Sequence, residues 1–484
     1  MSPSEHRPYR FGPRDARGLV LGVRPAQAAT VAVALIIAVG ALRASAGPGR
    51  FAVIVVDLVI GLSAAFVPLR GRTLGEWVPV ATGYLAAGAS GRRRTPAPGP
   101  HVPVGRRPST FAPFSIVEIE AGAGRRLGAV ADRRHGTLTG GLVVSGDAFA
   151  LFDDGDRDRA VAAWSSVLSA LATSPLAPTR VQWIERTVPD RRQALRDRVA
   201  SLLDETAVDA SDGAAVRARA SYAALVEAES AGAICHESIV AVSVGANAGR
   251  RALAAVGGAG PSTDGPARLA ETLTSLEARL SSVGYRVSGA LSPSGIAGYL
   301  DRTFRDDGAL VYGDRPWPIA TESHWGSFRT DALLHSTYWI AEWPRSDVSC
   351  EFLLPLLHDS GGRRTITVVM EPVSASRATR RAEHARTSAR ADSEIRRRHG
   401  FSQTARTSRQ HDAVIRREEE LASGHAAYRF SGYVTVSAPD AAALERSCAR
   451  VEQAAALARL ELRRLFGSQD AAFCCTLPVG RGCG

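Results

Sequence analysis

Lysine is missing from the chain, because all 59 basic residues are arginines. A lysine amine is required for Schiff-base chemistry, for attachment of pyridoxal phosphate and for the phosphate-binding position of a P-loop. The sequence therefore excludes these three mechanisms. A length of 484 residues exceeds what one hydrophobic core usually organises, so we expect two or more domains.

Recognised catalytic motifs are missing too: the chain contains no GxxxxGK[ST], GxSxG, HExxH or CxxC sequence. The few cysteines are typical of a reducing compartment. Adjacent Cys474 and Cys475, with Cys483 beyond them, match neither a zinc site nor a simple disulfide. The acidic run at residues 153–158 resembles a calcium loop but lacks its glycine and closing glutamate, which favours a turn before a helix. We therefore predict no enzymatic activity, no cofactor and no metal.

The formal charge of +11 is concentrated near the N-terminus. Residues 1–110 contain fourteen arginines against four acids, a net charge of +10, so the rest of the chain is close to neutral. Arginines beside apolar segments are typical of cytoplasmic membrane flanks and attract anionic lipid headgroups. The location of the charge therefore favours membrane lipid over nucleic acid as the partner of this region.

Two apolar runs, residues 28–42 and 51–69, predict a transmembrane helical hairpin over residues 28–69 that follows a basic cytoplasmic N-terminus at 1–27. Their connector carries only Arg43 and Arg50, whereas arginines are abundant on both outer sides. By the positive-inside rule, both termini of a multi-pass inner-membrane protein of this kind are cytoplasmic.

Two features of the hairpin leave alternatives open. Asp57 interrupts the second run, either near enough to the outer surface to reach Arg50 or water, or as a polar contact between the helices. The sequence Ala44-Ser45-Ala46 resembles a signal-peptidase site, so the first run could instead belong to a cleaved signal peptide.

Residues 70–110 predict an interfacial helix and a linker. Apolar residues recur at helical spacing over 72–89, where Trp77 suits the headgroup zone. Residues 91–108 combine proline, glycine and arginine, a composition that cannot bury a core. We expect the folded body to begin near Phe111.

The body alternates strand-like and helix-like patterns. Strand patterns at 116–120, 136–144 and 147–152, a helical stripe at 161–171 and a strand at 181–185 predict the order β-β-β-α-β. The second half of the body shows the same alternation of strand-like and helix-like patterns. We expect an α+β body of split β-α-β (ferredoxin-like) units.

Two domains are expected in the body, at residues 111–310 and 311–484, with a helical insertion at 376–423 that turns near Gly400-Phe401. Arg396, Arg397 and Arg398 make the insertion the one place where the body could contact nucleic acid or an acidic partner. Interspersed acids at helical spacing favour a solvated helix, and the aromatic residues that stack on bases are missing there apart from Phe401, so direct nucleic-acid contact is disfavoured.

Histidines and tryptophans between residues 317 and 358 provide an alternative. His324, His335 and His358 lie among several tryptophans and could line the pocket of a membrane-bound enzyme. Their spacings match no ligand set, so structural histidines are the default interpretation.

Three stretches resemble a known family: RTLGEWVPV at 72–80, VQWIERTVPD at 181–190 and LRRLFGSQDAAFCCTLPVG at 462–480. They are similar to actinobacterial integral membrane proteins of type IV secretion and conjugation-like gene clusters. The layout resembles a PrgI-like two-helix anchor followed by the N-terminal domain of a TraC/TraE-type conjugative ATPase. In those ATPases a segment like GSQDAAF…LP leads to the P-loop motor. Cys474 and Cys475 depart from the small, apolar residues usual there.

The resemblance implies a non-catalytic, membrane-anchored scaffold of a type IV-like secretion or DNA-transfer machine. Its implied partners are a separate P-loop traffic ATPase, other membrane subunits of the machine and further copies of itself. The candidate contact residues are Arg396, Arg397 and Arg398 and the segment Gly467, Ser468, Gln469 and Asp470. The alternative within secretion is a type VII component resembling EccE, which also pairs two N-terminal spans with an α/β body.

Overall fold

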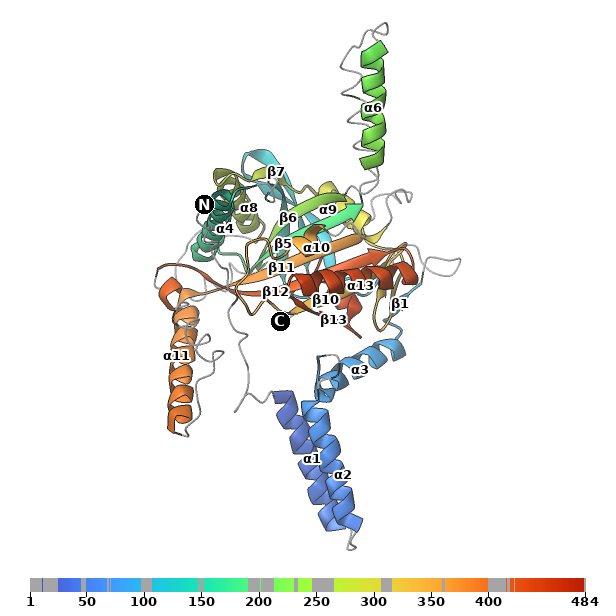
Figure 1. The fold of residues 1–484 in the computed structure, drawn as a ribbon, viewed down its shortest axis with the longest axis vertical. Coiled ribbons are helices and arrows are strands. Elements are labelled where there is room, and N and C mark those ends of the chain that lie inside the picture. Colours follow the sequence, from blue (N-terminus) through green and yellow to red (C-terminus); the bar gives the residue numbers. More distant parts are fainter. Residues whose placement is uncertain are drawn as a thin grey trace.

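In the part of the chain that the structure describes, one antiparallel sheet of 13 strands forms the centre of the molecule (Figure 1). The structure is a computed structural model and describes residues 11, 25–44, 49–67, 69, 71–96, 107–146, 149, 152–189, 201, 213–229, 234–245, 265–305, 316–358, 362–398, 415, 418–421 and 423–482. The main path of the sheet is β1-β8-β9-β10-β12-β11-β5-β6-β4-β3-β2, with β13 paired to β10 and β7 paired to β4. The strands are β1 (Arg94–Thr95), β2 (Phe114–Ala121), β3 (Arg125–Asp132), β4 (Thr137–Ser145), β5 (Arg180–Pro189), β6 (Ile234–Gly245), β7 (Arg286–Ala290), β8 (Thr321–Ser323), β9 (Phe328–Arg329), β10 (Leu334–Glu342), β11 (Arg363–Val373), β12 (Ala427–Ala438) and β13 (Glu461–Arg464).

The order of elements along the chain occurs twice. In the first repeat β4, α4, β5, α6, β6, α8 and β7 follow one another, and in the second repeat β10, α10, β11, α11, β12, α13 and β13 do the same. A strand pair precedes each repeat and a further helix, α9 or α14, follows it. The helices are α1 (Pro25–Ala44), α2 (Gly49–Phe66), α3 (Leu74–Ala89), η1 (Gly122–Gly124), α4 (Asp154–Thr173), α6 (Gly213–Glu229), α8 (Gly265–Ser282), α9 (Pro293–Phe304), α10 (Leu354–His358), α11 (Ala375–Arg398), α13 (Ala441–Leu457) and α14 (Gln469–Cys474).

The two repeats also place their strands in the same spatial order. In each repeat, the first strand has the fourth strand on one side and the third strand on the other, and the second strand lies beyond the third at the edge. The order is β7-β4-β6-β5 in one repeat and β13-β10-β12-β11 in the other. Because both second strands lie at an edge, β5 and β11 can pair with each other, and they do so in antiparallel register from Val181↔Met370 to Thr187↔Arg364. The repeats therefore share one continuous sheet.

This continuity corrects the predicted fold class. We expected ferredoxin-like units behind two membrane helices, and that fold class is wrong because the strands of both repeats belong to one large antiparallel sheet. Pairing of β5 with β11 removes both edges. The expected boundary near residue 310 falls between α9 and β8, and the sheet crosses it.

Helices cover one face of the sheet. The apolar stripe of α8, which includes Leu269, Leu273 and Leu276, is buried on the first repeat together with Val240 and Val242 of β6. In the second repeat α13 buries Leu444 and Val451 against β10 and β12 in the same way. This helix layer covers the larger part of the apolar core. The opposite face of the sheet is covered by other segments of the chain.

The opposite face is covered by the segments that follow each repeat. Helix α9 buries Ile296 and Phe304 there, in a cluster with Phe111, Trp317 and residues of α14. Phe111 stacks on Trp317 with ring centroids 5.5 Å apart. The chain beyond α14 completes this face and is the part of the molecule described below as the candidate functional site.

The transmembrane prediction at residues 28–69 falls on α1 and α2. The two helices pack closely, since a Cβ added at Gly61 would lie 2.4 Å from Ala34 Cβ. Within the ranges that the structure describes, no helix has both the length and the apolar character that a membrane crossing requires. The two helices of the expected hairpin are present, but its assignment as transmembrane and the multi-pass localisation in the inner membrane with both termini cytoplasmic are wrong. The apolar run of α1 lies between Thr30 and Arg43, and that of α2 is divided at Asp57.

Candidate functional site

The chain from residue 465 to residue 482, here called the C-terminal segment, crosses the sheet face from the second repeat to the first. It leaves β13 at Leu465, whose N–H donates to Thr337 O at 3.0 Å. Gly467 follows with φ +73°, a conformation that favours glycine, and its N–H donates to Trp325 O at 2.7 Å. A Cβ at this position would lie 2.7 Å from both Trp325 Cζ3 and Val80 Cγ1. The glycine therefore allows the segment, the body and α3 to approach one another.

Helix α3 is held at this point by aromatic packing. Trp77 stacks on Trp325 with centroids 5.8 Å apart and lies 6.2 Å from Phe466, and Tyr84 meets Trp325 edge-on at 5.1 Å. Trp77, expected at the headgroup zone of a membrane, thus packs on the body. The spacing of apolar residues over 72–89 correctly indicated a helix, and its partner was not apparent from that pattern.

Gln469 fixes the start of α14 to β10. Its side chain is 1% exposed, accepts the N–H of Thr337 at Oε1 over 2.8 Å and donates from Nε2 to Thr337 O over 3.2 Å. The amide thus meets both backbone groups of one residue, as a neighbouring strand would. Next to it, Asp470 accepts a hydrogen bond from Thr110 Oγ1 at 3.3 Å. Of the predicted contact residues in this segment, Gln469 is consequently engaged inside the protein.

Phe473 lies against a buried polar pair of the second repeat. His335 and Ser437 face each other on β10 and β12, with His335 Nδ1 2.7 Å from Ser437 Oγ. The other ring nitrogen of His335 lies 2.9 Å from Thr330 Oγ1, and the Phe473 ring centroid lies 4.3 Å from that of the imidazole. Burial lowers the pKa of His335 to about 3, and the charge of Arg363 acts in the same direction. The imidazole is therefore neutral at pH 7.

Gln182 of β5 holds the middle of the C-terminal segment. Its side chain is 1% exposed and donates from Nε2 to Cys475 O at 3.0 Å and to Leu477 O at 2.9 Å. Its Oε1 accepts the N–H of Gly480 at 3.2 Å. One side chain of the first repeat therefore satisfies three backbone groups of a segment that lies about 300 positions later in the sequence.

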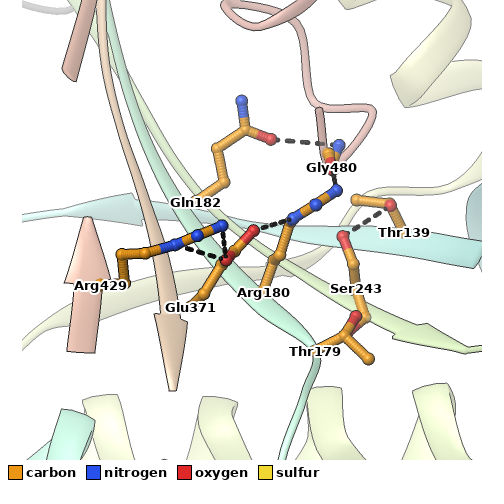
Figure 2. A network of polar contacts seen from close by, with 8 residues as sticks. All are labelled: Thr139, Thr179, Arg180, Gln182, Ser243, Glu371, Arg429 and Gly480. Atoms are coloured by element: carbon orange, nitrogen blue, oxygen red, sulfur yellow. Dashed lines mark hydrogen bonds and ion pairs between the residues drawn. The ribbon is translucent and has the colours of Figure 1, made fainter. Parts of the chain in front are cut away.

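Figure 2 shows where the segment ends on the first repeat. The hydroxyls of Thr139 on β4 and Ser243 on β6 lie 2.8 Å apart, directly below Gly480. A Cβ at Gly480 would lie 2.1 Å from Ser243 Oγ and 2.6 Å from Thr139 Oγ1, and the residue has φ +67°. Both the space and the backbone conformation therefore require glycine here.

An ion-pair network beside Gly480 joins the two repeats. Arg180 of β5 donates from Nη1 to Gly480 O at 2.8 Å and from Nε to Glu371 Oε1 at 2.8 Å. Arg429 of β12 approaches the other oxygen of Glu371 at 2.6 Å (Figure 2). Burial raises the pKa of Glu371, but the hydrogen bonds and charges of Arg180 and Arg429 outweigh this effect and hold its pKa below the usual value. The carboxylate thus bridges β5 and β12 across β11.

The last described residues fasten the segment to β3. Arg481 Nε lies 2.8 Å from Asp132 Oδ2, and the Arg481 guanidinium lies 5.0 Å from the ring centroid of Phe114. The Asp132 side chain is 2% exposed. In this way one segment touches β10 at its start, β5 in its middle, and β3 at its end.

The remaining predicted site residues lie elsewhere. Asp57 is half-buried on α2, and Arg396, Arg397 and Arg398 form the end of α11, where only the backbone is described. The expected turn at Gly400-Phe401 and Cys483 lie outside the described residues. The acidic run caps a helix, because Asp153 Oδ1 accepts the N–H of Asp156 at 2.7 Å, so the predicted turn before a helix is confirmed.

The three histidines of the alternative enzyme hypothesis have separate partners. His335 is buried as described above, His324 Nε2 lies 3.8 Å from Glu322 Oε2, and His358 ends α10, where its Nδ1 is 3.4 Å from Leu354 O. Among the described residues no group of three or more histidines, cysteines or acids could hold a metal ion. The structure thus assembles no common pocket from these side chains.

Sequence reasoning missed most of this site. Arg180, Gln182 and Gly480 were not singled out as functional residues, although two of them lie inside stretches that were quoted for their resemblance. The available signal was the polar Gln182 within the apolar strand VQWIE, a position where a buried amide needs partners. The partners themselves lie too far along the chain for any spacing pattern to identify them.

The fold and the site define an internally duplicated α+β protein whose two repeats share a sheet and are bridged by one C-terminal segment. No protein-family model and no curated protein matches the chain. The structure brings parts of the three stretches quoted above, at 72–80, 181–190 and 462–480, together at the C-terminal segment.

Proposed function

We propose that the chain is a non-catalytic scaffold subunit of a type IV-like secretion or DNA-transfer machine that docks a separate P-loop traffic ATPase. The observation that carries the proposal is the position of two helical insertions. Helix α6 lies between β5 and β6, and α11 lies between β11 and β12, which is the same place in each repeat. Both helices stand away from the sheet, in opposite directions (Figure 1). A rigid body with two projecting helices is suited to hold other proteins at two points.

The two projecting helices differ in chemistry. On α11 the arginines Arg377, Arg380 and Arg381 are exposed, and its sequence continues with further arginines to Arg398. The helix is tied at Arg386, whose Nη1 donates to Glu418 Oε1 at 2.7 Å. Its basic surface suits an acidic face of a partner and would speed association by electrostatic attraction.

Helix α6 instead exposes large apolar side chains. Val216 is 46%, Tyr222 52% and Leu225 57% exposed. Aromatic and aliphatic side chains of this kind provide the binding energy of protein interfaces, whereas rim charges mainly set the rate and the salt dependence of association. The proposal therefore assigns orientation to α11 and tight contact to α6.

The test is affinity purification of the tagged full-length chain, followed by mass spectrometry. We expect a P-loop ATPase to be recovered in stoichiometric amount. Replacing Arg396, Arg397 and Arg398 by glutamate should weaken recovery, with a larger loss at low than at high salt, because screening already weakens the contact at high salt. Tyr222→Ser should weaken recovery at both salt concentrations. Recovery of no P-loop ATPase with intact tagged protein would overturn the proposal.

A further inference from the structure

Three aromatic side chains form a slot at the margin of the second repeat. Trp343 follows β10, Phe352 precedes α10, and Phe430 lies on β12. The Trp343 ring centroid lies 5.2 Å from that of Phe430, at an interplanar angle of 75°, and 6.4 Å from that of Phe352. Gly432 lets the indole lie close to the sheet, because a Cβ there would come within 2.8 Å of Trp343 Cζ2. The slot is thus built by the fold from three separate elements.

Phe11, the described residue nearest the N-terminus, occupies this slot. Its ring stacks on Trp343 with centroids 5.0 Å apart and an interplanar angle of 29°, meets Phe352 edge-on at 5.2 Å and lies 6.2 Å from Phe430. All three separations fall in the range of favourable aromatic pairs. With Phe11 in place Phe430 is still 40% exposed, so the slot is open to solvent on that side.

The difference between the repeats explains why the slot exists. The connection from the first to the second strand is the long helix α4 in the first repeat, which covers its part of the sheet with Val167 and Leu171. The corresponding helix α10 is only 5 residues long. Trp343 and Phe352 are only partly buried against the core that α13 covers, and Phe11 lies on them.

An open groove continues from the slot. It has a volume of about 450 Å³, shares Trp343 with the slot, and is lined further by Glu342, Arg345, Ser346, Arg459, Leu460 and Glu461. Glu342 already pairs with Arg345, and Arg459 Nη1 donates to Ser346 Oγ at 2.8 Å. Glu342 and Arg345 are thus paired within the body, and the contacts seen with Phe11 are made by aromatic rings.

We propose that Trp343, Phe352 and Phe430 form a binding site for the phenylalanine of a peptide, which the N-terminal segment of this chain occupies through Phe11. Because the segment is tethered, its effective concentration at the slot is high, and a free peptide of the same sequence must compete with it. Removing the Phe11 ring should open the site to that peptide.

The experiment measures binding of a fluorescently labelled peptide of residues 5–17 to full-length chains by anisotropy. Phe11→Ala should bind the peptide about tenfold more tightly than the unmodified chain, as expected for a tether that supplies an effective concentration about ten times the dissociation constant. Addition of Phe430→Ser, at an exposed position, should abolish binding. Leu457→Ser, at an exposed apolar residue of α13 outside the slot, is the matched control and should leave binding unchanged.

Two further arms make the result decisive. A peptide with Phe11 replaced by alanine keeps Tyr9 and all arginines and should not bind, and raising the salt concentration should change the affinity of the original peptide little. Equal affinity for the unmodified chain and Phe11→Ala, binding that survives Phe430→Ser, or no binding to any chain would overturn the proposal. Circular dichroism of each variant confirms that it is folded.

Discussion

The same rung of the sheet is built from different residues in the two repeats. Thr139 is the last residue of β4 that pairs with β3, and Leu142 is the first that pairs with β7. In the second repeat His335 is the last residue of β10 that pairs with β9, and Tyr338 is the first that pairs with β13. Since both changes of partner take place across the same spacing, Thr139 and His335 occupy equivalent positions.

A serine lies opposite each of these residues, Ser243 on β6 and Ser437 on β12. The two pairs differ in the size of the residue opposite the serine, which is Thr139 on β4 and His335 on β10. The residue of the C-terminal segment that packs on each pair differs accordingly. The small pair of the first repeat lies below Gly480, and the pair with the imidazole lies below the Phe473 ring. The C-terminal segment thus packs on two equivalent positions of the sheet with residues of different size. Both repeats are thereby attached to the same segment.

The largest effect is expected where the segment has no space. Gly480→Ala should lower the free energy of unfolding by about 3 to 4 kcal/mol, from left-handed backbone strain plus the collision with Ser243 and Thr139. Gly136→Ala is the matched control, because Gly136 has φ +60° but open space around its Cβ position, and it should cost only about 1 kcal/mol. Chemical denaturation of both variants measures the difference. Equal losses would show that Gly480 is not packed against the hydroxyl pair.

A second prediction compares the two buried glutamines. Gln182→Leu removes three hydrogen bonds to backbone groups of the C-terminal segment and should cost about 3 kcal/mol, whereas Gln469→Leu removes the two hydrogen bonds to Thr337 and should cost about 2 kcal/mol. Both values come from denaturant titration of the purified variants. A neutral Gln182→Leu would contradict the role assigned to this side chain.

The histidine of the second repeat should make stability depend on pH. Burial lowers the pKa of His335 to about 3, so between that value and about 6.5 the unfolded chain binds a proton that the folded chain excludes. Stability is thus complete above pH 6.5 and falls as the pH drops below it, by up to about 1.4 kcal/mol per pH unit. His335→Gln should flatten this slope between pH 7 and pH 5 in denaturant titrations. An unchanged slope would rule out a buried neutral imidazole.

The smallest effect is expected at the ion-pair network between the repeats. The pKa of Glu371 is held below its usual value, so its contribution is present above about pH 4.3 and is lost as the pH falls through the lowered pKa. Because the carboxylate is partly exposed, Glu371→Gln should cost no more than about 1 kcal/mol at pH 7. Glu461→Gln, in a more exposed pair with Arg463, is the control and should have no measurable effect. A loss of stability in Glu461→Gln but not in Glu371→Gln would contradict the stabilising role assigned to the ion-pair network.

Sequence patterns were most informative where the chain contacts its near neighbours. The stripe of α8 and the strand 181–185 were predicted correctly, because burial of one face imposes a period that the residues display. Most of the expected strand at 147–152 lies outside the described residues, and β3 (Arg125–Asp132) was missed, since its glycine and alanines carry little strand signal. The observed order β2-β3-β4-α4-β5 has the form β-β-β-α-β, but β3 is not one of the strands that were expected.

Long-range contacts were beyond such patterns. Pairing of β5 with β11 joins the two repeats in one sheet, and nothing in either strand identifies the other as its partner. At the site, the motif around Gln469 was quoted for its resemblance, yet its attachment to Thr337 and the hydroxyl pair below Gly480 depend on residues far away in sequence. Apolar length alone also overstated α1 and α2 as membrane spans.

Native-state hydrogen exchange on Gly480→Ala tests most directly whether the C-terminal segment unites the two repeats. Gly480 itself contacts the hydroxyl pair of the first repeat, whereas β10 and β12 belong to the second. If the segment couples the repeats, amides of β10 and β12 should lose as much protection as those of β4 and β6. A loss confined to β4, β6 and the segment, with β10 and β12 as protected as in the unmodified chain, would contradict the account.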